Sequence, residues 1–374
     1  MKHLLIIGPV PPPIHGESLA IQHVIQSDKV KKSYQISVIN TNRKSVTSGG
    51  KFSLRKVYHD LHHVFQVWRK TRGHQIDMTY VSISQTKLGL IRDAWMIRIA
   101  SKRVKKVVAH LHGNNLGHVL DELGPLASSF VRRAIKKIDT GVVLSEALKG
   151  NFRNLPKHIA VVQNGIERDY FRNWDLEQAN KQRHERHSFT IVYLSNLIKT
   201  KGFSDLIQAV IQLAKEHHDV RLLLAGQIYD RGLFEKLMAD VKAAHLEQWI
   251  RYLGQVTGNR KKRLLLSGDL MALPTRYPIE GQPISIIEGM AAGMPILSTD
   301  QGGIPELIHG NGIVLSEVNP QSIASAIKTM MSDRSLCHHY AQVSRSRFLS
   351  TYTLDRSLQT LLSVFNNRLG RMTL

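Results

Sequence analysis

The sequence has one cysteine, no long apolar run and few acidic residues. Cys337 is the only cysteine among 374 residues, which excludes an internal disulfide and a zinc site built from cysteines. No apolar stretch approaches the roughly 18 residues that span a bilayer. The start, MKHLLIIGPVPPP, differs from a signal peptide because its apolar part is short and prolines follow it. We therefore expect a buried first strand and a cytoplasmic protein.

Other absences narrow the chemistry. The chain has no P-loop, no context for a serine–histidine–aspartate triad and no zinc-ligand spacing. Aromatic residues make up 6% of the chain, and none lies within the runs of basic residues. RNA recognition usually combines such charge with stacking platforms. We therefore expect no nucleic-acid partner.

The charge balance is strongly basic. The chain has 51 Lys and Arg against 29 Asp and Glu, and residues 1–180 carry 28 of the former against 13 of the latter. This excess favours an anionic partner such as a phosphorylated substrate or an acidic membrane surface, although solubility explains it equally well. Basic runs at 102–106, 132–137 and 260–263 predict peripheral contact with an anionic membrane.

Short apolar segments alternate with helical patterns along most of the chain. This alternation is typical of parallel sheets covered on both faces, and it restarts after a polar stretch, so we predict an α/β fold of two doubly wound domains. The predicted parts are a first domain at 1–170 completed by 350–374, a linker or surface segment at 171–188, and a second domain at 189–349. Predicted strands lie at 3–8, 34–39, 78–83, 106–112, 140–145, 159–165, 189–195, 220–226, 250–254, 269–274 and 295–300.

Two glutamates flank a predicted helix in the second domain. Glu280 lies in an irregular, proline-rich stretch and Glu288 lies in the helix expected over 284–292. A carboxylate can accept hydrogen bonds from vicinal sugar hydroxyls, and a helix N-terminus favours a phosphate. The order carboxylate, helix start, carboxylate therefore suits a sugar, a diphosphate and a ribose. The alternative is two solvated surface residues, against which the apolar and small neighbours argue.

Residues 278–308, PIEGQPISIIEGMAAGMPILSTDQGGIPELI, resemble the nucleotide-sugar signature of glycosyltransferase family 4. These are retaining enzymes of the GT-B fold, also called glycosyl transferases group 1. The family has two glutamates separated by seven residues, then a small-residue turn and a GGxPE loop. PPPIHGES, HLHGNN, VVQNGIE and LSNLIKTKGF resemble its other motifs, so the resemblance covers residues 1 to about 310. It implies two Rossmann-like domains facing across a cleft, with C-terminal helices that cross back to the first.

The resemblance implies a role for each matching residue. Glu288 would hold the ribose hydroxyls, Glu280 would bind the donor sugar, and Gly302 and Gly303 would allow close approach near the nucleotide. Backbone N–H groups at the helix start would bind the diphosphate. The donor-binding residues around this start are Gly281, Gln282, Pro283, Ile284 and Ser285.

The loop LSNLIKTKGF departs from the family pattern in one position. Lys201, before Gly202, matches the lysine that the family places on the diphosphate. Asn196, also a candidate donor-binding residue, stands where the family usually has arginine, and an amide lacks the two-pronged charge of a guanidinium. Lys199 is a candidate to supply the missing charge. The alternative interpretation is that Lys201 and Gly202 only mark the start of a helix and bind no ligand.

Two residues of the first domain complete the candidate site. Gly16, in the loop PPPIHGES, would let the backbone approach a phosphate or acceptor. His112, directly before Gly113, matches the histidine that the family places near the reacting sugar. His110 shares its face of the predicted strand. His112, Glu280 and Lys201 form the predicted catalytic set.

The resemblance implies transfer of a hexose, with retention of configuration, from a nucleoside diphosphate sugar. A UDP-sugar is the expected donor, and a glycan or polyprenyl-linked acceptor the expected partner, in cell-surface polysaccharide synthesis. No cofactor or metal ion is expected, because Asp-x-Asp, the metal-binding pair of the other large glycosyltransferase fold, is absent. Domains would close about a hinge near Asn164 and Gly165. Two other functions stay open: a sugar-nucleotide epimerase, and a decayed transferase that binds membranes or nucleic acid.

Overall fold

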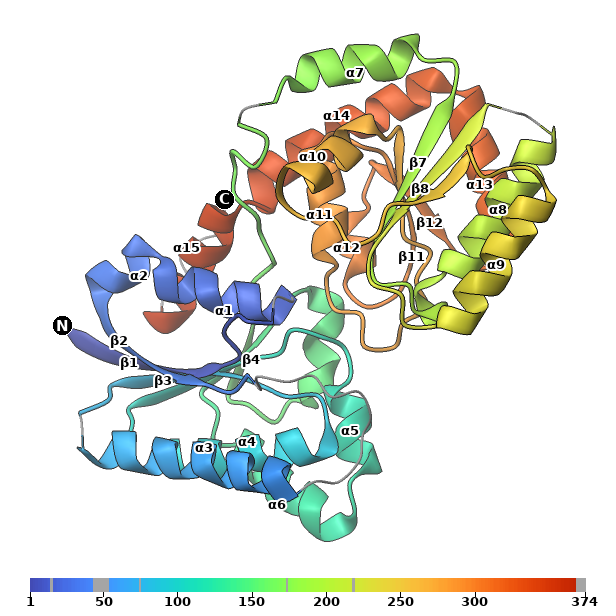
Figure 1. Cartoon of the computed structure of the whole chain (residues 1–374). Coiled ribbons are helices and arrows are strands. Elements are labelled where there is room, and N and C mark those ends of the chain that lie inside the picture. Colours follow the sequence, from blue (N-terminus) through green and yellow to red (C-terminus); the bar gives the residue numbers. More distant parts are fainter. Residues whose placement is uncertain (14–15, 43–53, 74, 173, 217–218, 368–374) are drawn as a thin grey trace. The chain divides into compact units, whose positions relative to one another are not determined.

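The computed structural model describes residues 1–13, 16–42, 54–73, 75–172, 174–216 and 219–367. It divides the chain into two compact units, Met1–Asn164 with Arg356–Leu374, and Gly165–Asp355 (Figure 1). Each unit contains one six-stranded parallel sheet with helices around it. The predicted α/β fold of two doubly wound domains is confirmed.

The first unit is built on the strand order β2-β1-β3-β4-β5-β6. β1 reads KHLLIIG and is buried from its second residue onward, as expected for a strand with helices on both faces. The order reverses between β1 and β3, which is where such sheets bind ligands at their carboxyl ends. The strands are β1 (Lys2–Gly8), β2 (Tyr34–Asn40), β3 (Met78–Ser82), β4 (Lys106–His110), β5 (Thr140–Val143) and β6 (His158–Val161).

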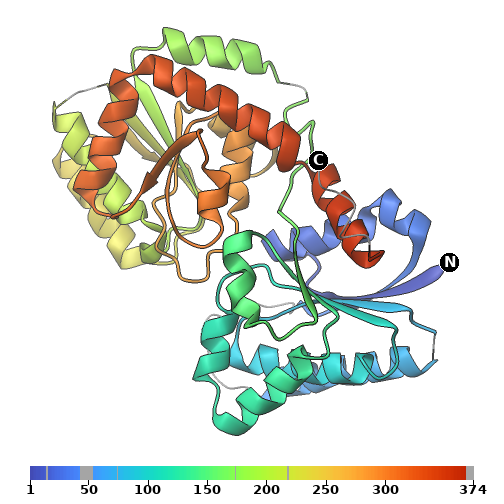
Figure 2. The same cartoon turned by 180° about the vertical axis from the view of Figure 1, so that it is seen from behind.

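Helices lie on both faces of this sheet. α3, α4 and α6 form one layer, and α1, α2 and α15 lie on the other face (Figures 1 and 2). Phe365, in the last helix, packs against Tyr34 and Tyr80, with ring centroids 6.0 and 5.4 Å apart. The helices are α1 (Gly16–Gln26), α2 (Asp28–Ser33), α3 (Leu54–Gly73), α4 (Lys87–Ala100), α5 (Leu116–Glu122), α6 (Pro125–Ile135), the 3-10 helix η1 (Glu146–Phe152) and α15 (Leu354–Phe365).

The second unit has the strand order β12-β11-β10-β7-β8-β9. Its order reverses between β7 and β10, so the loops after these two strands lie at the switch point. The strands are β7 (Phe189–Leu194), β8 (Val220–Ala225), β9 (Ile250–Tyr252), β10 (Leu270–Ala272), β11 (Ile296–Thr299) and β12 (Gly312–Leu315). The helices are α7 (Leu176–Glu185), η2 (Lys199–Lys201), α8 (Phe203–Glu216), α9 (Arg231–Ala243), α10 (Gly258–Ser267), α11 (Ile284–Ala291), α12 (Ile304–Leu307), α13 (Pro320–Ser332) and α14 (Arg334–Thr351).

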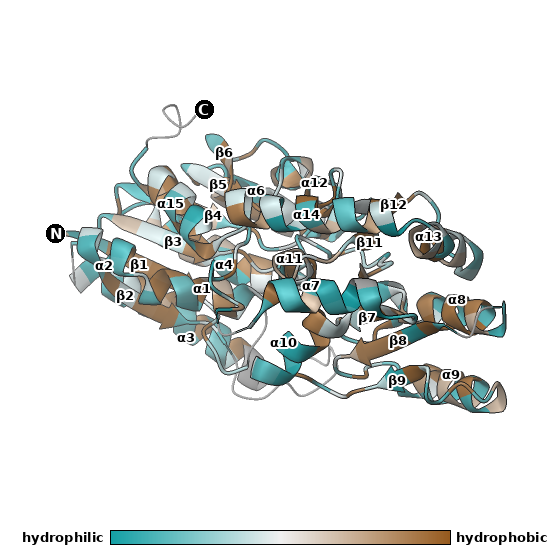
Figure 3. Ribbon diagram, turned by 90° about the horizontal axis from the view of Figure 1, so that it is seen from above, coloured by the Kyte–Doolittle hydropathy of each residue, from teal (hydrophilic) through white to brown (hydrophobic). Residues whose placement is uncertain are grey.

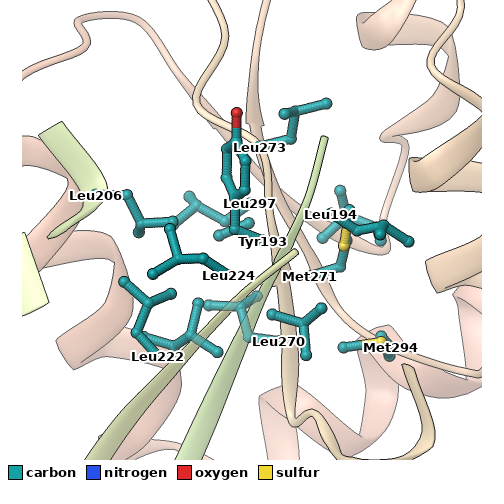
Figure 4. Close-up of a cluster of buried hydrophobic side chains, with 14 of the residues drawn as sticks. Tyr193, Leu194, Leu206, Leu222, Leu224, Leu270, Met271, Leu273, Met294 and Leu297 are labelled. Atoms are coloured by element: carbon teal, nitrogen blue, oxygen red, sulfur yellow. The ribbon is translucent and has the colours of Figure 1, made fainter. Parts of the chain in front are cut away.

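The core of the second unit holds the two switch-point strands in place. Leucine and methionine side chains of β7 and β10, of the strands beside them and of α8 fill this core (Figure 4). Tyr193 is fully buried in this cluster, and its hydroxyl donates a hydrogen bond of 3.0 Å to the carbonyl oxygen of Asn196. The core therefore anchors the loop that follows β7.

The polar stretch at 171–188, predicted as a linker or surface segment, contains the helix α7 of the second unit. Its surface is mostly hydrophilic (Figure 3). Arg183 is buried and donates hydrogen bonds of 3.1, 3.0 and 2.9 Å to the carbonyl oxygens of Leu265, Ala292 and Gly293. Burial lowers the pKa of Arg183 to about 10. The guanidinium of Arg183 attaches this helix to the unit, where other helices use an apolar stripe. The sequence of α7 therefore lacks the apolar periodicity that would have predicted a packed helix.

The two crossings between the units lie side by side. The first unit ends at Asn164 and resumes at Arg356. Ile166 donates to the carbonyl oxygen of Tyr352 at 3.1 Å, and Leu354 donates to that of Ile166 at 2.7 Å. The first unit thus ends a few residues before the predicted limit of 170 and resumes a few residues after the predicted 350. The strand β12 was missing from the prediction, because GIVL is short and partly exposed.

Candidate functional site

The loop after β7 presents Lys201 at the switch point of the second unit. Gly202 follows with φ of 76°, and a Cβ there would lie 1.9 Å from the carbonyl oxygen of Pro274. Only glycine fits this close approach of two backbones. Asn196 and Lys199, in the same loop, are exposed. The glycine therefore fixes the β7 loop against the loop that follows β10.

The loop after β10 carries Glu280 into contact with Lys201. The lysine Nζ lies 3.0 Å from Oε2 of Glu280, and the two side chains are 15% and 9% exposed. Thr275 donates to the same oxygen at 3.3 Å, and the Lys201 ammonium lies 4.9 Å from the ring centroid of Tyr277. A buried carboxylate is expected to be paired and hydrogen-bonded in this way.

The two glycines of the GGxPE loop pack against the backbone that carries Glu280. Gly302 has φ of 60°, and a Cβ there would lie 2.1 Å from the carbonyl oxygen of Glu280. Gly303 donates to the carbonyl oxygen of Gly281 at 2.7 Å. In the described residues the close approach that these glycines allow is therefore to the glutamate loop itself.

Helix α11 begins directly after this loop. Pro283 is its N-cap and supplies no side-chain hydrogen bond to the first turn, so the first N–H groups are open to an anion. Gln282 and Pro283 are buried, whereas Ile284 and Ser285 are partly exposed. At the other end, Arg345 donates to the carbonyl oxygen of Ala291 at 2.7 Å, beside the contacts of α7. Cations at the C-terminus stabilise the helix dipole.

Glu288 lies one turn from the end of α11 and is 5% exposed. Tyr170 donates a hydrogen bond of 3.0 Å to its Oε1, and Lys261 Nζ donates to the same oxygen. Burial, with the Glu288 carboxylate as the next cause, raises the pKa of the Tyr170 hydroxyl. Lys262 lies over the Tyr170 ring, 4.9 Å from its centroid. The carboxylate is therefore held by two donors on one oxygen.

In the first unit, His110 ends β4 and His112 follows it in the loop, beyond the last residue of the strand. Their rings stack with centroids 4.0 Å apart. Tyr80 and His110 Nδ1 share a hydrogen bond of 2.6 Å. Burial, and secondarily the neighbouring His112, lowers the pKa of His110 well below its usual value. His110 is therefore a neutral, buried support for the more exposed His112.

The loop after β1 leads to Gly16, which is exposed at the start of α1. His15, which precedes it, lies outside the described residues. Glu17, one residue later, accepts a hydrogen bond from the hydroxyl of Ser82 at the end of β3. Burial raises the pKa of Glu17. The switch point of the first unit thus holds a carboxylate that the sequence analysis did not single out.

The sequence model of the family described as glycosyl transferases group 1 matches residues 175–347. N-acetyl-alpha-D-glucosaminyl L-malate synthase of Bacillus anthracis is 28% identical over 267 residues, which cover 70% of this chain and 67% of that enzyme. An uncharacterized glycosyltransferase of Methanocaldococcus jannaschii is 24% identical over 98% of both chains. The match to the glycosyl transferases group 1 model thus lies within the second unit of the chain.

Solved structures show the same fold as this chain. Anabaena HepE in complex with UDP has a TM-score of 0.73 at 19% identity and covers 98% of this chain and 100% of its own. Sucrose-phosphate synthase of Thermosynechococcus elongatus has a TM-score of 0.75 at 13% identity, over 98% and 99%. At these identities the likeness establishes the GT-B fold alone.

The candidate site in the second unit includes two residues that the sequence analysis did not assign to it. Lys261 lies in the basic run 260–263, which we predicted to contact a membrane, yet its ammonium bonds Glu288. Tyr170 follows the predicted hinge segment. Neither had a local signal, since both reach Glu288 from distant parts of the chain.

Two features are absent from the part of the chain that the structure describes. None of their helices is long and apolar enough to cross a membrane. No group of three or more His, Cys, Asp or Glu side chains among them is arranged to hold a metal ion.

Proposed function

We propose that this glycosyltransferase transfers a hexose from a nucleoside diphosphate sugar to a hydroxyl with retention of configuration and without a metal ion. The observation that carries the proposal is the arrangement around α11. Two buried carboxylates, Glu280 and Glu288, flank the N-terminal turn, and each is paired with a lysine. Acceptors of hydrogen bonds on either side of an anion-binding helix start suit a ligand with hydroxyls, a diphosphate and hydroxyls in that order.

In the proposed complex, Glu288 binds the ribose and Glu280 binds hydroxyls of the hexose. The diphosphate lies at the first N–H groups of α11, near Gln282 and Ser285, and Lys201 neutralises part of its charge. Gly281, Pro283 and Ile284 shape the turn. In the first unit, Gly16 and His112 serve the phosphate or acceptor and the donor sugar respectively.

The proposed reaction breaks the bond between the anomeric carbon and the diphosphate oxygen. The acceptor oxygen forms its bond to the same carbon from the same face, and its proton passes to the departing phosphate. No protein nucleophile is proposed. Lys201 and the helix N-terminus stabilise the leaving group because they are positioned where negative charge develops.

The relatives support a nucleotide sugar but differ in base and acceptor. A mannosyltransferase of Mycobacterium tuberculosis, 24% identical over 61% of this chain and 61% of its own, is GDP-mannose-dependent and acts on a phosphatidylinositol monomannoside. HepE was solved with UDP and with UDP-glucose. We propose a UDP-sugar donor and a glycan or polyprenyl-linked acceptor in cell-surface polysaccharide synthesis, with the enzyme in contact with the inner face of the membrane.

Calorimetric titration with UDP, GDP and ADP in the presence of a metal chelator tests the donor site. We expect one-to-one binding of UDP that is lost in Glu288→Ala and retained in Glu235→Gln, a control at an exposed surface pair. Absence of binding by all three nucleotides would refute the proposal. With the donor identified, its turnover with and without acceptor separates a transferase from an epimerase, since an epimerase needs no acceptor.

A further inference from the structure

Helix α3 in the first unit has apolar residues on two sides. One side packs against α4 and buries His63, Val67 and Thr71. These residues are four apart, the spacing that places side chains on one side of a helix. The core therefore accounts for only one of the two apolar sides.

The opposite side carries a second set, which we call the α3 stripe: Tyr58, Leu61, Phe65 and Trp68. The first three are 68%, 64% and 51% exposed, and successive members are three or four residues apart, so they form one continuous row. The rings of Phe65 and Trp68 stack with centroids 5.6 Å apart. Single exposed apolar residues are ordinary, but a continuous row of four indicates an interaction surface.

The neighbouring helices also carry aromatic side chains. α3 packs beside α4 and α4 beside α6, in one layer on the sheet (Figure 1). Trp95 of α4 is 50% exposed and contacts Phe130 of α6, with centroids 4.8 Å apart. Arg98 lies over Phe130, and Arg72 lies over Trp68, at 5.2 and 5.0 Å. Aromatic rings with guanidinium groups above them thus occur at two places in the layer.

The charge of the three helices is almost entirely positive. α3, α4 and α6 contain ten Lys and Arg but only two acidic residues, Asp60 and Asp93. Arg92 bonds both of these carboxylates, at 3.4 and 2.7 Å, and Asp93 is fully buried. The acids of these helices therefore neutralise an internal arginine, and the outward charge of the helices is cationic.

We infer that the α3 stripe docks this enzyme on an anionic membrane surface, an inference that deepens the proposed action on a lipid-linked acceptor and rests on it. Tyr, Trp and Phe rings prefer the headgroup level of a bilayer, and Lys and Arg beside them bind acidic lipids. A second copy of the chain fits less well, because two cationic faces repel each other. Single-stranded nucleic acid usually binds in a charged groove, whereas this row lies along one convex helix.

Vesicle sedimentation of the full chain tests the inference. The vesicles are phosphatidylcholine alone, or phosphatidylcholine with about 30% phosphatidylglycerol at roughly 0.15 M salt. We expect binding to the anionic vesicles only, weakened roughly tenfold or more in the double variant Leu61→Ser, Phe65→Ser. The matched control is Tyr229→Ser, Val314→Ser, which changes two exposed apolar residues of the second unit. The control is expected to bind as the unchanged protein does.

Four outcomes would overturn the inference. They are no binding to anionic vesicles, equal binding by the double variant, a dimer of the unchanged protein that the double variant abolishes, or retention of single-stranded RNA in preference to vesicles. Nucleotide titration of the same preparations separates this inference from the donor site. Loss of vesicle binding with nucleotide binding intact supports the inference. If the protein binds vesicles but no nucleotide, the proposed function is refuted and the inference about the docking surface still holds.

Discussion

The ion pair between Lys261 and Glu288 is expected to stabilise the fold, although the sequence did not indicate that Lys261 has this partner. The glutamate side chain is 6% exposed and the lysine side chain 25%. In Lys261→Met, Tyr170 remains as a donor to the carboxylate. A charged group left with an incomplete set of partners in such a place costs about 1–3 kcal/mol. The midpoint of thermal unfolding should fall by about 3–10 °C.

A double-mutant cycle isolates the pair. Glu288→Gln removes the charge and still accepts from Tyr170, so in Lys261→Met, Glu288→Gln no buried carboxylate lacks its lysine. We expect the double variant to be more stable than the sum of the two single effects predicts, with a coupling of about 1–2 kcal/mol. Calorimetry gives the four midpoints and enthalpies. Arg263→Met, at an exposed position of the same helix, is the control and should leave the midpoint unchanged.

The cycle has a clear negative outcome. If Lys261→Met leaves the midpoint where it was and the coupling lies within about 0.3–0.5 kcal/mol of zero, the two residues act independently. The lysine would then belong to the surface, as the basic run first indicated, and the account of how Glu288 is held would be wrong.

Four further changes have expected outcomes. Gly202→Ala should lower the unfolding midpoint and weaken nucleotide binding in titration, because its Cβ would collide with the Pro274 carbonyl. Gly165→Ala, whose Cβ would lie 2.4 Å from a backbone oxygen, should lower the midpoint in calorimetry. Lys199→Met should weaken binding of UDP more than of uridine if this lysine meets the diphosphate. Burial lowers the pKa of His63 to about 4. Its neutral form therefore stabilises the fold above about pH 6.5, and that stability is lost as the pH falls towards 4. In His63→Leu, the free energy of unfolding measured by denaturant titration should change less over this pH range.

The order of strands and helices could be predicted, because strands with two covered faces are apolar throughout and helices are not. The segments around β1 and β7 matched their predicted positions within one residue. The helix α7 could not be predicted, since Arg183 docks it through three carbonyl groups and leaves no apolar stripe. Hydrogen bonds to backbone of distant segments have no periodicity in sequence.

The sequence predicted where the two glutamates lie relative to helix α11, but it did not predict which side chains surround them. The apolar segment before them and the small residues after them predicted burial for Glu280 and Glu288, and both are buried. Their lysines come from two other segments, one of them a loop after β7 and the other the helix α10. A basic run has the same composition whether it faces water or a carboxylate, so the membrane interpretation of 260–263 and the site interpretation were indistinguishable without the fold.

The pairing also limits what these lysines can do for a donor. Lys201 and Lys261 balance Glu280 and Glu288, so the four side chains together carry no net charge, and a diphosphate would arrive at a site without an excess of cations from them. Asn196 contributes none, because it replaces the expected arginine. Attraction beyond these two balanced pairs is available from the N-terminal turn of α11 and from Lys199, which is exposed in the same loop as Lys201. A helix N-terminus has about half a unit of positive charge, less than a diphosphate carries. If the diphosphate nevertheless binds strongly, Lys199 is expected to supply much of the attraction. Nucleotide titration of Lys199→Met then separates the contribution of this lysine from that of the helix N-terminus.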